Sequence, residues 1–100
     1  MATPHSKAYA YEKRLAKRLK GKRIIDQSKG DCDIVSSWLC VEAFQKAIPD
    51  YLKEEVMQAV RASAKRGWKH MPITVWREKG KKDDEALVVI RLCDWEAWYI

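Results

Sequence analysis

Residues 32–44 read CDIVSSWLCVEAF and contain two short runs rich in β-branched and aromatic residues. The runs, residues 32–36 and 38–44, follow each other so closely that an antiparallel hairpin is the natural connection. Each run carries one acidic side chain, Asp33 in the first and Glu42 in the second. A carboxylate among apolar strand residues is costly unless a cation or a metal compensates it. Asp33 and Glu42 are therefore the first candidates for a functional site.

The segment before the hairpin has the pattern of a helix. Apolar residues recur every three or four positions across residues 6–20, with Lys and Arg between them, which predicts an amphipathic helix with a cationic outer face. Ser6 is the expected N-cap and Gly21 the expected C-terminal stop. Residues 23–25 are β-prone, and residues 26–30 have the composition of a turn or loop.

The segment after the hairpin adds further elements. They are a helix at residues 49–65, strands at 72–77 and 86–92, and a short helix at 94–100. Pro49 is expected in the first helical turn, Gly67 at the helix end, and Asp94 as the cap of the last helix. The chain contains no repeat or dividing linker, so we predict one domain spanning residues 1–100, of the α/β (α+β) class.

Positive charge is concentrated near the N-terminus. Residues 1–30 hold nine Lys and Arg against two acids, whereas residues 31–100 hold eleven against twelve, so the excess of +6 lies in the first third of the chain. Such a field attracts a polyanion, and DNA is the expected partner; a solvated helix face is the alternative. The candidate DNA-binding residues are Lys13, Arg14, Lys17, Arg18, Lys20, Lys22, Arg23 and Lys29.

Other classes of protein fit the sequence less well. No apolar run approaches the roughly 20 residues that cross a bilayer, and no apolar stretch of a secretory signal follows the basic N-terminus. We expect a cytoplasmic protein with no membrane partner. Cys32, Cys40 and Cys93 contain no close pair, which favours free, mostly buried thiols over metal ligands. The five tryptophans are expected in the core or in a subunit interface, and stacking on exposed bases is the alternative.

The two hairpin carboxylates suit a divalent cation. If neighbouring strands carry them, Asp33 and Glu42 converge on one side of the sheet, where Mg²⁺ or Mn²⁺ accepts oxygen ligands and keeps waters for a substrate phosphate. The alternative is that Glu42 faces water on an edge strand and that Asp33 belongs to a turn.

Together these segments resemble the PD-(D/E)XK nuclease superfamily, most closely its small Holliday-junction-resolvase-like members from phages and prophages. The resemblance rests on residues 11–16, on GDCDIV at 30–35, on LCVEAF at 39–44 and on the helix from Pro49 to Ala59. It continues through VWREKG at 75–80 and ALVVIRL at 86–92. It implies a restriction-endonuclease-like αβββαβ core, with a mixed central sheet flanked by helices, in a bacterial or virus-infected cell.

The resemblance also implies roles for individual residues. Asp33 matches the metal-binding aspartate of the family, and Glu42 matches the acid of its Glu-x-Lys element. The Ala43 carbonyl would be a further metal ligand, and Glu12 matches an acid of the first helix that assists metal binding. Gln58 is a weaker match to a polar residue of the second helix. The implied activity is Mg²⁺- or Mn²⁺-dependent cleavage of branched or junction DNA by a homodimer.

One position departs from the family pattern. The lysine of the Glu-x-Lys element would stand at position 44, where this chain has Phe44. A phenyl ring can neither orient the attacking water nor stabilise charge on the phosphate. Lys46 is the candidate replacement, although it starts about 6–7 Å further along an extended strand.

Three functions remain open from the sequence. The first is a metal-dependent DNA endonuclease with Asp33, Glu42, Glu12 and Lys46 as catalytic residues. The second is a DNA-binding module on the same fold that has lost catalysis, and Phe44 favours this function. The third is a phage-encoded protein that blocks a host enzyme, in which the aromatic residues 95–100 matter more than the basic helix.

Overall fold

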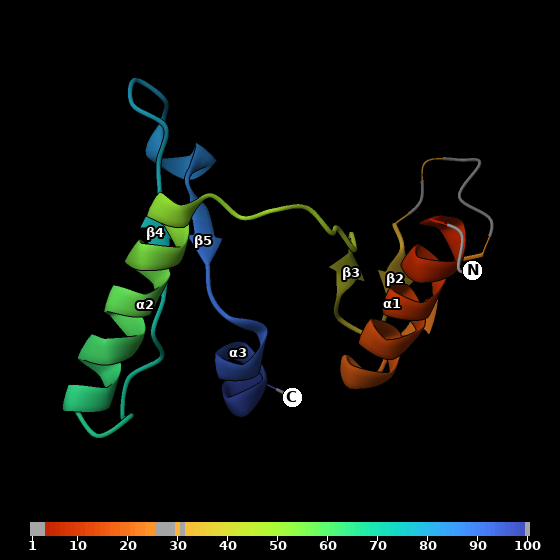
Figure 1. The fold of residues 1–100 in the computed structure, drawn as a ribbon, viewed down its shortest axis with the longest axis horizontal. Coiled ribbons are helices and arrows are strands. Elements are labelled where there is room, and N and C mark those ends of the chain that lie inside the picture. Colours follow the sequence, from red (N-terminus) through yellow and green to blue (C-terminus); the bar gives the residue numbers. More distant parts are fainter. Residues whose placement is uncertain (1–3, 26–29, 31, 100) are drawn as a thin grey trace. The chain divides into compact units, whose positions relative to one another are not determined.

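The chain has a mixed α+β fold. The computed structural model describes residues 4–25, 30 and 32–99, with the backbone alone for residues 4–8. The order of helices and strands is the predicted one, with one short 3₁₀ helix added (Figure 1). The described chain divides into two compact units, unit 1 (Met1–Lys46) and unit 2 (Ala47–Ile100). The single domain stays a prediction.

Unit 1 is a helix on a small antiparallel sheet. Helix α1 (Pro4–Arg18) is followed by β1 (Lys22–Arg23), β2 (Ile34–Val35) and β3 (Cys40–Val41), with β2 in the middle of the sheet. Arg23 pairs with Ile34, and Ile34 pairs with Val41. The predicted hairpin is confirmed, and Ser36 closes it because its hydroxyl accepts the Leu39 N–H at 3.1 Å.

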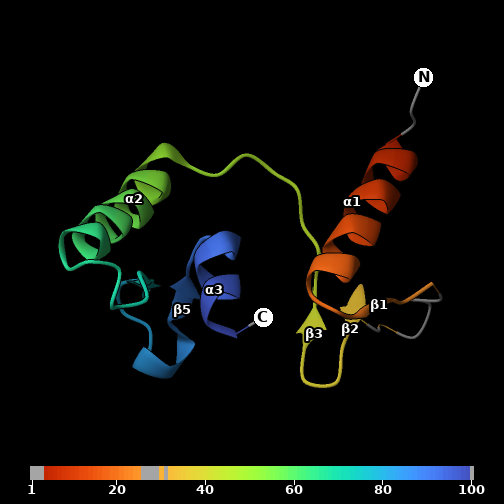
Figure 2. The same ribbon diagram turned by 90° about the horizontal axis from the view of Figure 1, so that it is seen from below.

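The core of unit 1 lies between α1 and the sheet. Figure 2 shows α1 running beside β1 and β2, and α1 contacts both strands. Leu15 and Leu19 of the predicted apolar stripe are buried, together with Ala16. Ile34 on the middle strand is 0% exposed, and its strand contacts α1. The 3.6-residue period therefore identified the correct helix face.

The ends of α1 differ from the predictions. The helix begins at Pro4, so Ser6 lies inside it and the predicted N-cap is wrong. At the other end, the Gly21 N–H donates to Ala16 O and the Lys20 N–H donates to Lys17 O. These two bonds form a Schellman motif, in which Lys20, with a φ of 56°, occupies the left-handed position. Gly21 is required for space instead, since a Cβ there would lie 2.8 Å from Val35 O.

Unit 2 pairs a long helix with a two-stranded sheet. Helix α2 (Asp50–Lys65) is followed by the antiparallel strands β4 (Thr74–Trp76) and β5 (Leu87–Val89), with η1 (Asp83–Glu85) between them and α3 (Leu92–Tyr99) after them. Helix α2 packs on β4, where the rings of Tyr51 and Trp76 meet edge to face with centroids 5.9 Å apart. Val60 and Ser63 are the buried residues of α2.

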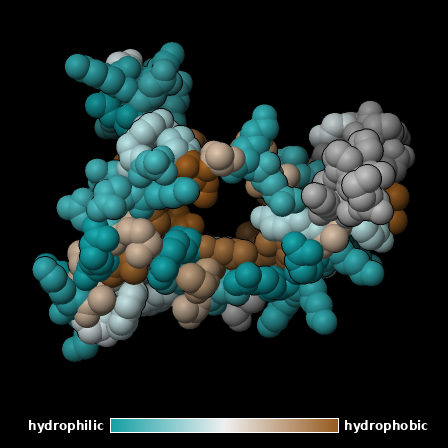
Figure 3. Space-filling model, viewed as in Figure 1, coloured by the Kyte–Doolittle hydropathy of each residue, from teal (hydrophilic) through white to brown (hydrophobic). Residues whose placement is uncertain are grey.

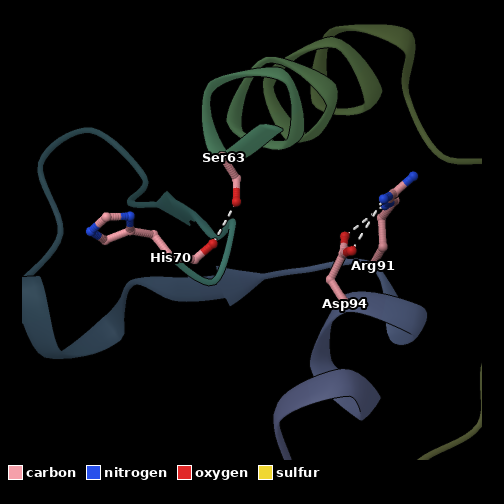
Figure 4. A network of polar contacts seen from close by, with 4 residues as sticks. All are labelled: Ser63, His70, Arg91 and Asp94. Atoms are coloured by element: carbon pink, nitrogen blue, oxygen red, sulfur yellow. Dashed lines mark hydrogen bonds and ion pairs between the residues drawn. The ribbon is translucent and has the colours of Figure 1, made fainter. Parts of the chain in front are cut away.

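The predicted ends of the two helices in unit 2 are partly correct. Gly67 has a φ of 72° and terminates α2, as predicted, whereas Pro49 is the N-cap and not a residue of the first turn. Helix α3 begins at Leu92, so Asp94 is not its cap. Asp94 accepts two hydrogen bonds from Arg91, at 2.7 and 3.1 Å (Figure 4). These bonds raise the pKa of Arg91 above its ordinary value.

Several apolar side chains are exposed in each unit. Trp38, Trp68 and Trp98 are each more than half exposed, so a core position is wrong for these three, and the predicted alternative of a subunit interface stays a prediction. Cys40 and Cys93 are free thiols as predicted, but both are exposed. Figure 3 shows apolar surface among the hydrophilic residues. In the described part of the chain, no helix combines the length and the apolarity needed to cross a membrane.

Candidate functional site

Asp33 is held in the sheet of unit 1 by its backbone and its side chain. It directly precedes β2 and is 9% exposed. Its carbonyl accepts the Ile24 N–H at 2.8 Å, which continues the β1–β2 pairing by one residue. Its own N–H donates to Val41 O at 2.9 Å, and its carboxylate Oδ2 accepts the Ala43 N–H at 2.7 Å. The carboxylate therefore has a defined position beside the chain that leaves β3.

Glu42 follows β3 directly and is exposed. Ile34 and Val41 are cross-strand partners. Asp33 precedes Ile34 and Glu42 follows Val41, so both lie at the same end of the hairpin. The Asp33 N–H donates to Val41 O, although the register partner of Val41 is Ile34, one residue further along. The hydrogen-bond ladder between β2 and β3 is therefore irregular at this point. The Asp33 carboxylate reaches the peptide group that joins Glu42 to Ala43. Three residues of the predicted metal site are thus brought together at one end of the hairpin.

Binding of Mg²⁺ or Mn²⁺ by Asp33, Glu42 and the Ala43 carbonyl stays a prediction. Among the residues that the structure describes, no group of three or more His, Cys, Asp and Glu side chains is placed to hold a metal. Mg²⁺ does not require such a group, because it is usually held by one or two carboxylates with waters and substrate phosphates as further ligands. Asp33, Glu42 and the Ala43 carbonyl are the chain's own candidates for this coordination.

Glu12 has a partner that the sequence analysis missed. Its Oε2 lies 2.6 Å from Arg23 Nε, and the guanidinium carbon of Arg23 lies 4.1 Å from the centroid of the Tyr9 ring. Both members of the ion pair are largely shielded, with 15% and 26% of their side chains exposed. They are eleven positions apart in the chain, so no local pattern reveals the pair. The metal-binding role of Glu12 stays a prediction, in competition with this contact.

Phe44 and Lys46 lie beyond the end of the strand. The structure ends β3 at Val41, so the predicted strand 38–44 is too long and its face alternation does not extend to these two residues. Phe44 is 72% exposed. The Lys46 ammonium nevertheless lies 5.7 Å from the centroid of the Phe44 ring. The lysine side chain therefore reaches back over the ring at position 44.

The exposed side of α1 carries the predicted positive charge. Lys13 and Lys17, and likewise Arg14 and Arg18, are four residues apart, so these four exposed side chains lie on one face. Lys20 and Lys22 are exposed as well, whereas Arg23 is partly buried. Lys29 lies outside the described residues. Gln58 is exposed on α2 of unit 2, and its role stays a prediction.

Unit 1 thus combines a buried carboxylate, an adjacent exposed one and a cationic helix face. No family model matches the chain, and no curated protein or solved structure does either. The case for an activity therefore rests on the chemistry of these residues.

Proposed function

We propose that this chain binds branched DNA and hydrolyses its phosphodiester bonds with Mg²⁺ or Mn²⁺, as a Holliday-junction-resolvase-like protein of the PD-(D/E)XK type. The observation that carries the proposal is the hydrogen bond from Ala43 N–H to the shielded carboxylate of Asp33. The proposal includes the αβββαβ core, and the chain has its order of elements. The described strands form two antiparallel sheets, so their pairing does not support the mixed central sheet flanked by helices. It also includes a homodimer, since a junction presents two strands for cleavage.

Each residue of the site has a separate task in this proposal. Asp33 is oriented by the Ala43 N–H, and its carboxylate is an oxygen ligand of the kind that a hard cation prefers. Glu42 supplies the second carboxylate. A divalent ion bound there would activate water and neutralise the scissile phosphate. Lys46 supplies positive charge near position 44, where its ammonium lies over Phe44.

Affinity for DNA comes from a different part of unit 1. The face of α1 with Lys13, Arg14, Lys17 and Arg18 presents four cations at helical spacing. Phosphate contacts of this kind supply most of the affinity for DNA and carry little sequence information. Binding is therefore expected to depend on charge and on the shape of the DNA, and to weaken steeply with salt.

A second function is favoured by Phe44. Its ring stands where the family has the lysine that assists the attacking water, and it is largely exposed. A chain without this lysine would keep its phosphate contacts, because they lie on α1. The second candidate is therefore a DNA-binding module without nuclease activity.

Cleavage of a labelled four-way junction, with and without Mn²⁺, tests the proposal. The first variant is Asp33→Asn, which keeps an oxygen acceptor for the Ala43 N–H but removes the charge. Its matched control is Asp50→Asn, an exposed carboxylate of unit 2. Lys46→Ala, with Lys53→Ala as its control, tests the replacement lysine. Phe44→Lys restores the motif.

The endonuclease predicts Mn²⁺-dependent nicking that Asp33→Asn and Lys46→Ala lose and that both controls keep. Tight binding without product, together with nicking by Phe44→Lys, would support the binding module. Nicking that survives Asp33→Asn would refute the proposed metal site. Failure of the chain to bind DNA at low salt would refute both functions and favour a protein that blocks a host enzyme.

A further inference from the structure

The turn after α2 exposes a tryptophan among positive charges. Trp68 is 54% exposed, and Lys65, Arg66 and Lys69 beside it in the chain are exposed as well. Of residues 64–70, Trp68 is the only large apolar side chain. The pattern combines one aromatic plane with several cations, and no part of the proposed nuclease site uses it.

The backbone holds this turn in a defined conformation. Trp68 has a φ of 60°, a left-handed value that bulky residues rarely adopt. Its N–H donates to Ser63 O at 2.9 Å, and the Gly67 N–H donates to Ala64 O at 3.0 Å. The buried Ser63 hydroxyl donates to His70 O and fixes the far side of the turn (Figure 4). The tryptophan is thus presented by a hydrogen-bonded turn and not by a loose loop.

The folding of unit 2 does not account for this arrangement. A tryptophan stabilises a fold through the area that it buries, and Trp68 leaves more than half of its surface in water. Its left-handed backbone adds a conformational cost. An unfavourable backbone conformation combined with an exposed aromatic ring indicates a binding role.

We infer that Trp68 stacks on an unpaired nucleobase while Lys65, Arg66 and Lys69 contact the neighbouring phosphates. Aromatic planes interleaved with cations are the usual means of binding single-stranded nucleic acid. The inference rests on the proposed DNA binding and deepens it, because it adds unpaired bases, such as those of a single-stranded branch, to the DNA that the chain would recognise. It assigns unit 2 the recognition of those bases, whereas the cationic face of α1 binds the duplex backbone.

The observations favour a nucleic acid over a membrane surface. A helix or loop that lies in a membrane interface buries a broad apolar face. Here the nearby residues in the chain include three exposed cations, Lys65, Arg66 and Lys69, and Ala64 and Gly67 add little apolar area. The ring has the area of one base, and the cations match a phosphate backbone.

The test compares binding of a single-stranded oligothymidylate and of a duplex of the same length to the full chain. The variants are Trp68→Ala and Trp68→Phe, with Trp98→Ala as the control because Trp98 is also in unit 2 and is 51% exposed. Trp68→Ala is expected to weaken binding of the single strand by about fivefold or more, and Trp68→Phe to keep most of the affinity, since a phenyl ring still stacks. Trp98→Ala leaves binding unchanged.

Duplex binding separates this inference from the proposed function. If the chain binds duplex and Trp68→Ala binds the single strand as tightly as the unmutated chain, the stacking role is refuted and the proposed function stands. If the chain binds neither nucleic acid, both are refuted. Loss of binding to anionic phosphatidylserine vesicles in Trp68→Ala, without loss for the oligonucleotide, would assign the turn to a membrane and overturn the inference.

Discussion

The carboxylate of Asp33 accepts a hydrogen bond from the backbone N–H of Ala43, with 2.7 Å between Oδ2 and N. The Asp33 side chain, and not a backbone carbonyl, accepts the hydrogen bond from the segment that follows β3. It therefore joins the start of β2 to residues beyond the hairpin, and it places the carboxylate of Asp33 beside the peptide group of Glu42.

This contact predicts different stabilities for two variants at position 33. Asp33→Ala leaves the Ala43 N–H without its acceptor and should lower the free energy of unfolding by about 1–3 kcal/mol. Asp33→Asn keeps an amide oxygen for the same bond and should lose less. Urea denaturation followed by circular dichroism measures both. Equal losses in the two variants would show that the charge, and not the hydrogen bond, stabilises this site.

The close packing of α1 and β2 predicts that Gly21 tolerates no side chain. A Cβ at this position would lie 2.8 Å from Val35 O and 2.9 Å from Ile34 Cγ2. Gly21→Ala should therefore cost about 1–3 kcal/mol of stability through overpacking. Gly80→Asn is the comparison for backbone strain without a clash, because Gly80 has open space around it but a φ of 86°, which asparagine adopts at less cost than most residues. A melting temperature unchanged in Gly21→Ala would contradict the packing described.

The ion pair between Glu12 and Arg23 predicts a measurable coupling. A double-mutant cycle with Glu12→Gln and Arg23→Gln should give a favourable interaction of about 0.5–1 kcal/mol, reduced by solvent because both side chains are partly exposed. Mn²⁺ titration of the same variants separates the two roles of Glu12. Zero coupling combined with weaker Mn²⁺ binding in Glu12→Gln would assign this residue to the metal site.

The cationic face of α1 predicts the salt dependence of DNA binding. Replacing Lys13, Arg14, Lys17 and Arg18 by Gln should flatten the plot of log affinity against log salt by about 0.9 for each phosphate that the variant no longer neutralises. The control replaces Lys53 and Arg61 of α2, which are paired with Asp50 and Glu54. Duplex binding at several salt concentrations measures the slopes. An unchanged slope in the fourfold variant would mean that other residues bind the phosphates.

The local elements were predictable because their signals are short-range. The apolar period placed Leu15 and Leu19 in the core, and the β-prone runs around Asp33 and Glu42 predicted the hairpin. The ends were less predictable. Ser6 and Asp94 have the chemistry of caps, but both lie inside their helices, since cap identity is a weak preference that neighbouring turns override.

The sequence by itself determined the order of helices and strands, the basic character of α1 and the choice of Asp33 and Glu42 as candidate ligands. These follow from periodicity, charge and residue type, which are properties of neighbouring residues. Only the tertiary structure decided that Glu12 pairs with Arg23, that Ala43 donates to Asp33 and that Gly21 lies against Val35. Such contacts join residues that are ten or more positions apart. They form when a helix and strands pack together, and no local pattern in the chain encodes them.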